Sequence, residues 1–138
     1  MNKDIRTTNI LLLRTAAITL LLALVLAWCL TFTKALKLPY FVATFQNYDM
    51  LLSAHLDFLM MTMLLLGFYG ARIALPLIFQ WPMAIGSITN PALFFVGSIM
   101  GDIQNPVYLG IVFISISLTT FGYAMAAITI LRRSLSAS

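Results

Sequence analysis

The sequence predicts an all-α integral membrane protein with a four-transmembrane-helix bundle, and three observations support this fold class. Its 138 residues are 62% hydrophobic and only 9% charged, whereas soluble domains are typically about half apolar and a quarter charged. Four apolar segments each approach the roughly 20 residues that a spanning helix needs. Basic residues gather at the ends of these segments and form no stripe, so a nucleic-acid-binding surface is excluded. We therefore expect one membrane domain over residues 1–138.

The apolar segments place the elements in chain order. We expect spanning helices at 10–32, 51–73, 80–100 and 107–131. The first is longer than a signal-peptide core and lacks a clear cleavage site, so we interpret it as a retained helix. The linker 33–49 is rich in aromatic residues, which favour the headgroup region, so it is expected on the membrane surface. Pro76 is expected to close the second helix and Pro82 to lie in the first turn of the third.

The basic residues predict the orientation of these spans. If the N-terminus is cytoplasmic, six basic residues fall on that side and two on the other. The first group is Lys3, Arg6, Arg14, Arg72, Arg132 and Arg133, and the second is Lys34 and Lys37. We therefore expect both termini in the cytoplasm, with Asp49 and Asp102 on the opposite face, and the bacterial inner membrane as the location.

His55, the only histidine, precedes Asp57 by two residues in the second expected helix. Ionisable groups inside a bilayer lose their water, so they indicate a functional site by default. Two residues along a helix correspond to about 200° of rotation, so these two side chains cannot pair within the helix. His55 shares its face with Thr62 and Tyr69. Asp57 needs a partner from another helix, or its carboxyl reaches the headgroup region.

The chain offers few metal ligands. Cys29 is the only cysteine, which excludes an intrachain disulfide and a Cys-x-x-Cys motif. One histidine with scattered carboxylates cannot assemble the three or four ligands that zinc requires. A single imidazole is sufficient as an axial ligand of haem, and Phe, Leu and Met are abundant enough to line an apolar slot. The alternative is that His55 only forms hydrogen bonds.

Polar residues also recur at helical spacing on the last two expected helices. The third helix carries Gln80, Ser87, Asn90 and Ser98 on roughly one side, and the fourth carries Tyr108, Ser115, Thr119 and Tyr123. These stripes predict either a wet pocket or ordinary hydrogen bonding between helices. Asn90 is followed by Pro91, and a proline kink often shapes a cavity.

The run Leu52-Ser53-Ala54-His55-Leu56-Asp57 resembles a motif of the small membrane isomerases, a family that includes hydroxylaminobenzene mutase and styrene oxide isomerase. The mutase branch is more similar, since its members carry a Ser-Ala-His-Leu-acidic run followed by a Met, here Met60. Residues 70–76 and 89–95 also fit the family pattern, and the four-helix layout agrees over 10–131.

That resemblance implies a membrane homo-oligomer, a trimer, that holds haem b with His55 as the axial iron ligand. Phe58 and Leu59 would contact the cofactor. It further implies a redox-neutral rearrangement of a small apolar epoxide or hydroxylaminoarene from the bilayer, with haem iron as a Lewis acid. Asn90, helped by Thr62, would orient the substrate.

The chain departs from the family at three polar positions. An Asn that follows the family histidine by six residues is Met61 here, and the Asp and Tyr that flank the third-helix Asn are Gly86 and Phe94. Only Asn90 of that set is retained. A second interpretation is therefore a non-catalytic haem-binding or structural membrane subunit. A transporter or channel is less favoured, because few charges converge inside the spans.

Overall fold

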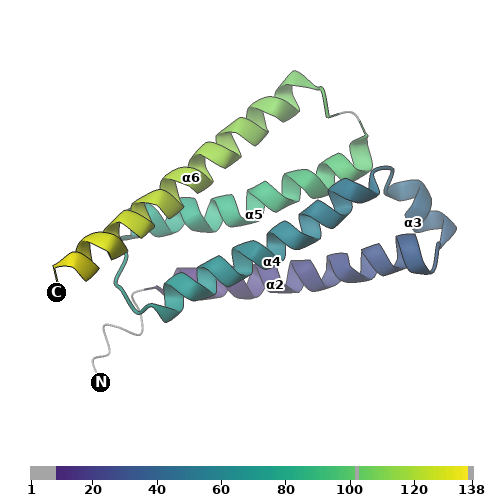
Figure 1. Ribbon diagram of the computed structural model, residues 1–138. Helices are drawn as coiled ribbons and strands as arrows, with labels where there is room; N and C mark the ends of the chain where they lie inside the picture. Colours follow the sequence, from purple (N-terminus) through teal and green to yellow (C-terminus); the bar gives the residue numbers. More distant parts are fainter. Residues whose placement is uncertain (1–8, 102, 137–138) are drawn as a thin grey trace.

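The computed structural model describes residues 9–101 and 103–136, and Lys3, Arg6 and Asp102 lie outside them. Within these described residues, four helices are long and apolar enough to cross a membrane. They are α2 (Ile10–Leu30), which continues as the π-helical turn η1 (Thr31–Ala35), α4 (Tyr48–Gly70), α5 (Leu77–Met100) and α6 (Pro106–Leu135). A short helix, α3 (Pro39–Thr44), precedes α4, and the described residues contain no strand (Figure 1). The predicted all-α fold class is confirmed.

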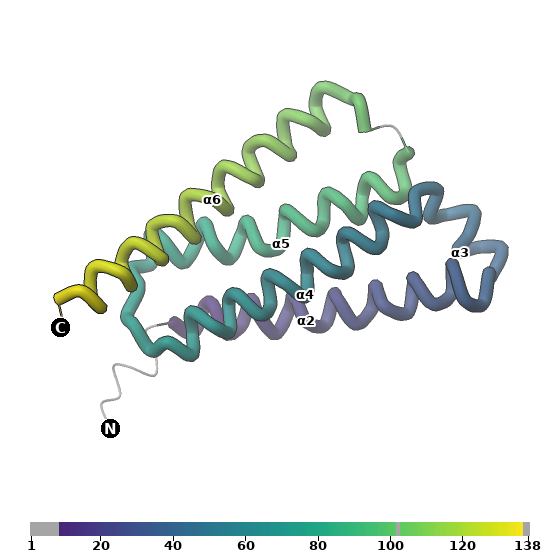
Figure 2. Tube along the Cα trace, viewed as in Figure 1, coloured from purple at the N-terminus to yellow at the C-terminus, as the bar shows by residue number. Residues whose placement is uncertain are grey.

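The four long helices are not equally enclosed. α4 packs along α2 on one side and α5 on another, while α6 packs mainly on α5 and meets α4 where the Phe68 and Tyr123 rings are in contact. Figure 2 shows α6 tilting away from α2 and α4 toward its Pro106 end. The connections at α3 and between α5 and α6 lie at one end of the molecule, and the start of α2 and the end of α6 lie at the other. One long side of α4 is therefore left without a covering helix.

The helix boundaries differ from expectation where capping residues set them. α4 begins at Tyr48 because Asn47 caps it, with its side-chain oxygen accepting from the Met50 N–H at 3.1 Å. α4 ends at Gly70, and Pro76 has an extended backbone and caps α5. The prediction that Pro76 closes the second helix was therefore wrong. Pro82 lies in the second turn of α5 rather than the first, because α5 begins three residues earlier than expected.

The segment expected as a surface loop is largely helical. It contains η1 and α3, and its aromatic rings contact one another: Phe32 and Phe41 have centroids 5.0 Å apart, and Phe41 stacks on Phe45 at 6.3 Å. Phe45 is buried against α5, where its ring lies 6.0 Å from Phe95. The segment is thus packed onto the end of the helices.

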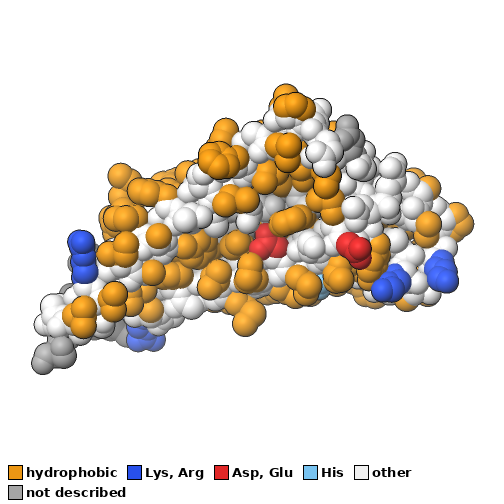
Figure 3. All heavy atoms as spheres, turned by 45° about the horizontal axis from the view of Figure 1, so that its top comes forward, with side chains coloured by type: hydrophobic (Ala, Val, Ile, Leu, Met, Phe, Trp, Pro, Cys, Tyr) orange, Lys and Arg blue, Asp and Glu red, His pale blue; other side chains and the backbone are white. Residues whose placement is uncertain are grey.

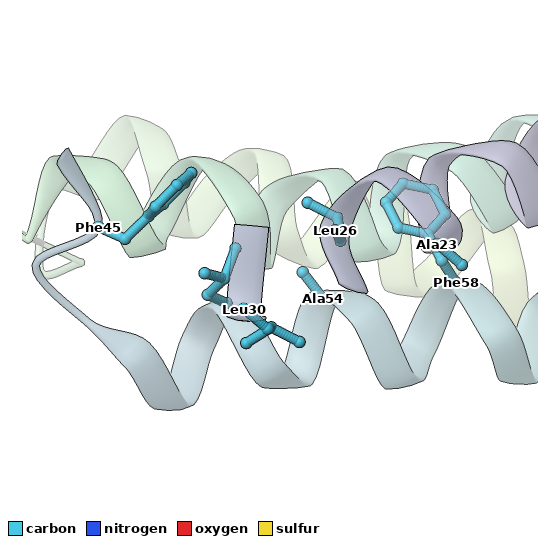
Figure 4. Close-up of a cluster of buried hydrophobic side chains, with 7 residues drawn as sticks. Ala23, Leu26, Leu30, Phe45, Ala54 and Phe58 are labelled. Carbon is cyan, nitrogen blue, oxygen red and sulfur yellow. The ribbon is translucent and has the colours of Figure 1, made fainter. Parts of the chain in front are cut away.

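Two clusters of buried apolar side chains hold the helices together. The first joins α2 and α4 near the α3 end of the molecule and is drawn in Figure 4. It consists of Ala23, Leu26, Leu30, Phe45, Leu51, Ala54 and Phe58. The second lies nearer the termini: Leu12, Ala16, Leu65, Leu75, Met83 and Ala126. Many other large apolar side chains are exposed, and hydrophobic groups cover much of the face in Figure 3. Such a surface is suited to lipid.

Candidate functional site

His55 lies at the interface between α4 and α2, half-buried. Its Nδ1 lies 2.9 Å from the backbone oxygen of Ala23 in α2. A carbonyl oxygen carries no proton, so Nδ1–H is the donor in this hydrogen bond. In the neutral imidazole the other nitrogen, Nε2, then keeps its lone pair. Within the described part of the chain, no residue forms a hydrogen bond with Nε2.

Small residues make this contact between helices possible. Ala23 and Ala54 are both fully buried where α2 meets α4. Small side chains allow two membrane helices to approach closely. The imidazole of His55, next to Ala54 in the chain, therefore reaches across to the backbone of α2. The ring orientation is fixed by the packing of the two helices and not by another side chain.

The residues expected beside His55 separate into two groups. The Thr62 hydroxyl lies 2.8 Å from both Thr19 Oγ1 and the Phe58 carbonyl oxygen, so it bridges α4 and α2. Phe58 is only 3% exposed and belongs to the core between these helices. Leu59, one turn after His55, is partly exposed. Of the two apolar residues predicted to contact a cofactor, Leu59 retains open surface beside the histidine and Phe58 does not.

The polar stripes on α5 and α6 join these two helices. Ser87 Oγ and Tyr123 OH lie 2.7 Å apart, and so do Thr89 Oγ1 and Ser115 Oγ. Farther along, Tyr108 OH donates to the Leu93 carbonyl oxygen at 2.8 Å. The expectation of ordinary interhelical hydrogen bonding is confirmed for these residues. Gln80 and Ser98 are buried on α5, and Gln80 donates to the Leu75 carbonyl oxygen.

Asn90 lies on the face of α5 that is directed to α6. A side chain at Gly86, one turn earlier, would collide with Thr119, and Leu93, one turn later, accepts from Tyr108. Asn90 is half-buried, and its amide forms no hydrogen bond with any residue in 9–101 or 103–136. Thr62 and His55 contact α2 instead. The structure therefore does not bring Asn90 together with either of them in one chain.

Asp57 lies on the other side of α4 from His55, as the helical period predicts. It is 9% exposed, and its Oδ2 is buried without a hydrogen-bond partner in the part of the chain that the structure describes. Tyr123 of α6 lies close enough to interact with it electrostatically. Asp57 is nine residues into α4, about 14 Å along the helix. Its short side chain is thus enclosed between helices.

A surface hollow lies elsewhere, at the α3 end of the molecule. It measures about 740 Å³ and is formed by residues of η1, α3 and the start of α4, including Lys34 and Lys37. Among the described residues, no three His, Cys, Asp or Glu side chains gather as a metal site. No protein-family model, curated protein or solved structure matches this chain.

Proposed function

We propose that this protein is a haem-b-binding membrane isomerase in which His55 is the axial ligand of the iron. The observation that supports the proposal most is the hydrogen bond from His55 Nδ1–H to the Ala23 carbonyl oxygen. Histidines that bind metals usually donate their other ring N–H to a carbonyl or carboxylate, which fixes the ring and directs the free nitrogen at the metal. His55 has this arrangement, with Nε2 left for a ligand.

The surroundings of His55 fit a flat apolar cofactor on one side. Leu59 is partly exposed one turn away, and the adjacent Leu56 is 54% exposed. One chain therefore supplies the imidazole and one apolar wall. Because a haem has two faces, the second wall would come from another copy. This incompleteness supports the proposed homo-oligomer, a trimer in the family that the sequence resembles.

The proposed reaction is a redox-neutral rearrangement of a small apolar epoxide or hydroxylaminoarene that enters from the bilayer. When bound, haem iron supplies a Lewis acid that polarises a substrate oxygen without being reduced. The chain's own contribution is to hold the imidazole at a fixed angle and to keep the site dry among apolar side chains. Since His55 and Asn90 lie on different faces of one chain, a joint role in one pocket requires two copies.

The visible spectrum of the purified protein tests the haem proposal. His55 is the only histidine, so the protein is expressed with sufficient haem and purified through a tag without histidine. We expect a Soret band in the wild type, its loss in His55→Ala, and its partial return when imidazole is added to that variant. Asn90→Ala is the matched control and should keep the band. The proposal would be wrong if the wild-type protein were folded but colourless, or if the Soret band were unchanged in His55→Ala.

A second candidate is a haem-binding subunit without catalysis. It is favoured by the apolar residues at positions where the resembled family is polar, since Met61 is buried and Phe94 is 37% exposed with no polar atom to offer. The discriminating assay is turnover of hydroxylaminobenzene and of styrene oxide by haem-loaded protein. Formation of an aminophenol or an aldehyde supports the isomerase, and no product from either compound supports the non-catalytic subunit.

We also propose that both termini are cytoplasmic and that the protein belongs to a bacterial inner membrane. Among the described basic residues, Arg14, Arg72, Arg132 and Arg133 lie toward the end with the termini, while Lys34 and Lys37 lie at the α3 end. Cytoplasmic ends of membrane helices carry an excess of Lys and Arg. This distribution supports the cytoplasmic placement of the termini.

A further inference from the structure

The buried carboxyl of Asp57 has no hydrogen-bond partner among the described residues, and the proposed haem site does not use it. It is 91% buried on the side of α4 opposite His55, with Oδ2 enclosed and unbonded. A carboxyl inside a membrane helix is costly unless a partner compensates for its lost water. A second binding function on this side of α4 would account for its presence.

The packing register brings Asp57 level with polar groups of α5. α4 and α5 run antiparallel, and at their α3 end the Asn47 N–H donates to the Ser98 carbonyl oxygen. Ten residues further along α4 and about ten back along α5, Asp57 is therefore level with Ser87 and Asn90. The same turns of α5 face α6, whose Tyr123 hydroxyl lies 2.7 Å from Ser87 Oγ. We refer to Asp57, Ser87, Asn90, Phe94 and Tyr123 as the Asp57 cluster.

The Asp57 cluster combines one acidic group with neutral oxygen acceptors and aromatic rings. Asn90 has an amide oxygen that no described residue uses. Phe94, one turn beyond Asn90, is 37% exposed, and the Tyr123 ring packs against Phe68 with centroids 5.7 Å apart. No Lys or Arg occurs in α4, α5 or the first 26 residues of α6. The chain itself therefore provides no cation at this depth.

The cluster also borders the lipid-facing surface. α6 packs mainly on α5 and tilts away from α4 toward its Pro106 end, so α4 and α6 diverge in that direction (Figure 1). Asn90 and Phe94 both keep exposed surface. A molecule dissolved in the bilayer can thus reach the cluster at Asn90 and Phe94, while the Asp57 carboxyl is buried.

We propose that the Asp57 cluster binds a small organic ammonium ion with an apolar body. The ammonium group would pair with the Asp57 carboxylate and donate its remaining N–H groups to the Asn90 and Tyr123 oxygens. The apolar body would lie against Phe94, and aromatic faces attract cations. A bare metal ion fits less well, because only one charged ligand is present and hard cations take six or more oxygens.

Binding of phenethylammonium to protein in phosphatidylcholine nanodiscs, measured by calorimetry at neutral pH, tests this proposal. The matched neutral probe is 2-phenylethanol, which has the same ring and chain. We expect saturable binding of the ammonium ion and at least about tenfold weaker binding of the alcohol, the loss of one charged interaction. Asp57→Asn should cause a loss of similar size, and Tyr123→Phe, which keeps the ring, a smaller one.

Two further variants distinguish binding at the Asp57 cluster from binding elsewhere on the protein. Asp49→Asn removes the exposed carboxyl in the first turn of α4 and should leave the affinity unchanged. His55→Ala should also bind normally, so that failure of the haem proposal is distinguished from failure of this one. Equal binding of the alcohol to the wild type, equal binding of the ammonium ion to Asp57→Asn, or competition by sodium at equal ionic strength would overturn the proposal. The alcohol comparison uses the wild type alone, so it remains decisive if a variant fails to fold.

Discussion

At the scale of single residues, most hydroxyl groups in these helices donate to a carbonyl oxygen three or four residues earlier in the same helix, and a few join one helix to another. Thr19 and Thr62 connect α2 to α4, and Ser87 and Tyr123 connect α5 to α6. Water is absent from the bilayer core, so such groups bond within the protein. Asp57 Oδ2 and the Asn90 amide have no hydrogen-bond partner among the described residues, and they are therefore candidates for ligand contacts.

The Thr19–Thr62 contact should contribute modestly to stability. Thr62→Val keeps the shape of the side chain and removes the hydroxyl that lies 2.8 Å from Thr19 Oγ1. We expect the free energy of unfolding in mixed detergent micelles to fall by about 1 kcal/mol, in the range measured for hydrogen bonds between membrane helices. Thr19→Val and the double variant complete a thermodynamic cycle. Additive losses would show that the two hydroxyls do not interact.

Single residues differ in how far the sequence predicts their roles. His55 and Asp57 could be identified because ionisable groups are rare in apolar segments, and helical rotation correctly separated them. The partner of His55 could not be identified, since the Ala23 acceptor is a backbone atom 32 residues away. Nor does periodicity indicate that Phe58 faces the core while Leu59 keeps open surface, because that depends on where α2 packs.

At the scale of elements, glycine permits the close contact between α5 and α6. A Cβ at Gly122 would lie 2.7 Å from the Met83 backbone nitrogen, and one at Gly86 would lie 2.9 Å from Thr119 Cα. Gly86 of α5 and Gly122 of α6 thus each face the backbone of the other helix. Because backbone atoms cannot rotate aside, the two helices would have to separate to accept a side chain.

Gly122→Ala should therefore weaken the packing of α6 on α5. We expect a loss of about 2 kcal/mol in the free energy of unfolding, the usual effect of overpacking a tight interface. Gly110→Ala is a matched control in the same helix, because nothing lies within 4 Å of its added Cβ. The control should be neutral or gain up to about 1 kcal/mol from helix propensity. Equal stability of both variants in a detergent denaturation series would contradict this account.

The start of α4 depends on its cap. Asn47→Ala removes the oxygen that accepts from the Met50 N–H, and we expect a cost of about 1 kcal/mol in thermal or detergent unfolding. Asn47→Ser keeps an acceptor and should recover most of the stability. If Asn47→Ala and Asn47→Ser are equally destabilised, the cap bond is not the cause.

The four spanning helices could be predicted from apolar length, whereas their ends could not. Hydropathy changes gradually near residues 47–51 and 70–77, and the boundaries are set by local chemistry. Asn47 caps α4, and Pro76 adopts an extended backbone and starts α5. A proline is compatible with the residue before a helix as well as with the end of one. The position of Pro76 in the sequence is therefore compatible both with the end of α4 and with the start of α5.

At the scale of the whole molecule, the apolar exterior and the charged ends divide the surface into three zones. Large exposed hydrophobic side chains cover the helices, and basic groups occur at both ends (Figure 3). Lys34 lies 4.6 Å from the centre of the Tyr48 ring at the α3 end. Aromatic and basic side chains together favour the membrane interface. The long axis of the molecule is therefore expected to cross the bilayer.

Cysteine labelling tests both this placement and the proposed orientation. Cys29 is the only cysteine, so Cys29→Ala provides a background for Lys37→Cys at the α3 end and Arg133→Cys near the C-terminal end of α6. Both positions are exposed. In intact spheroplasts, a membrane-impermeant maleimide should label the variant at position 37, and should label that at 133 only after the membrane is opened. Arg72→Cys is the control for the inner side and should behave like position 133. Labelling of both ends without opening contradicts a spanning arrangement, and the reversed pattern contradicts cytoplasmic termini while keeping the four spans.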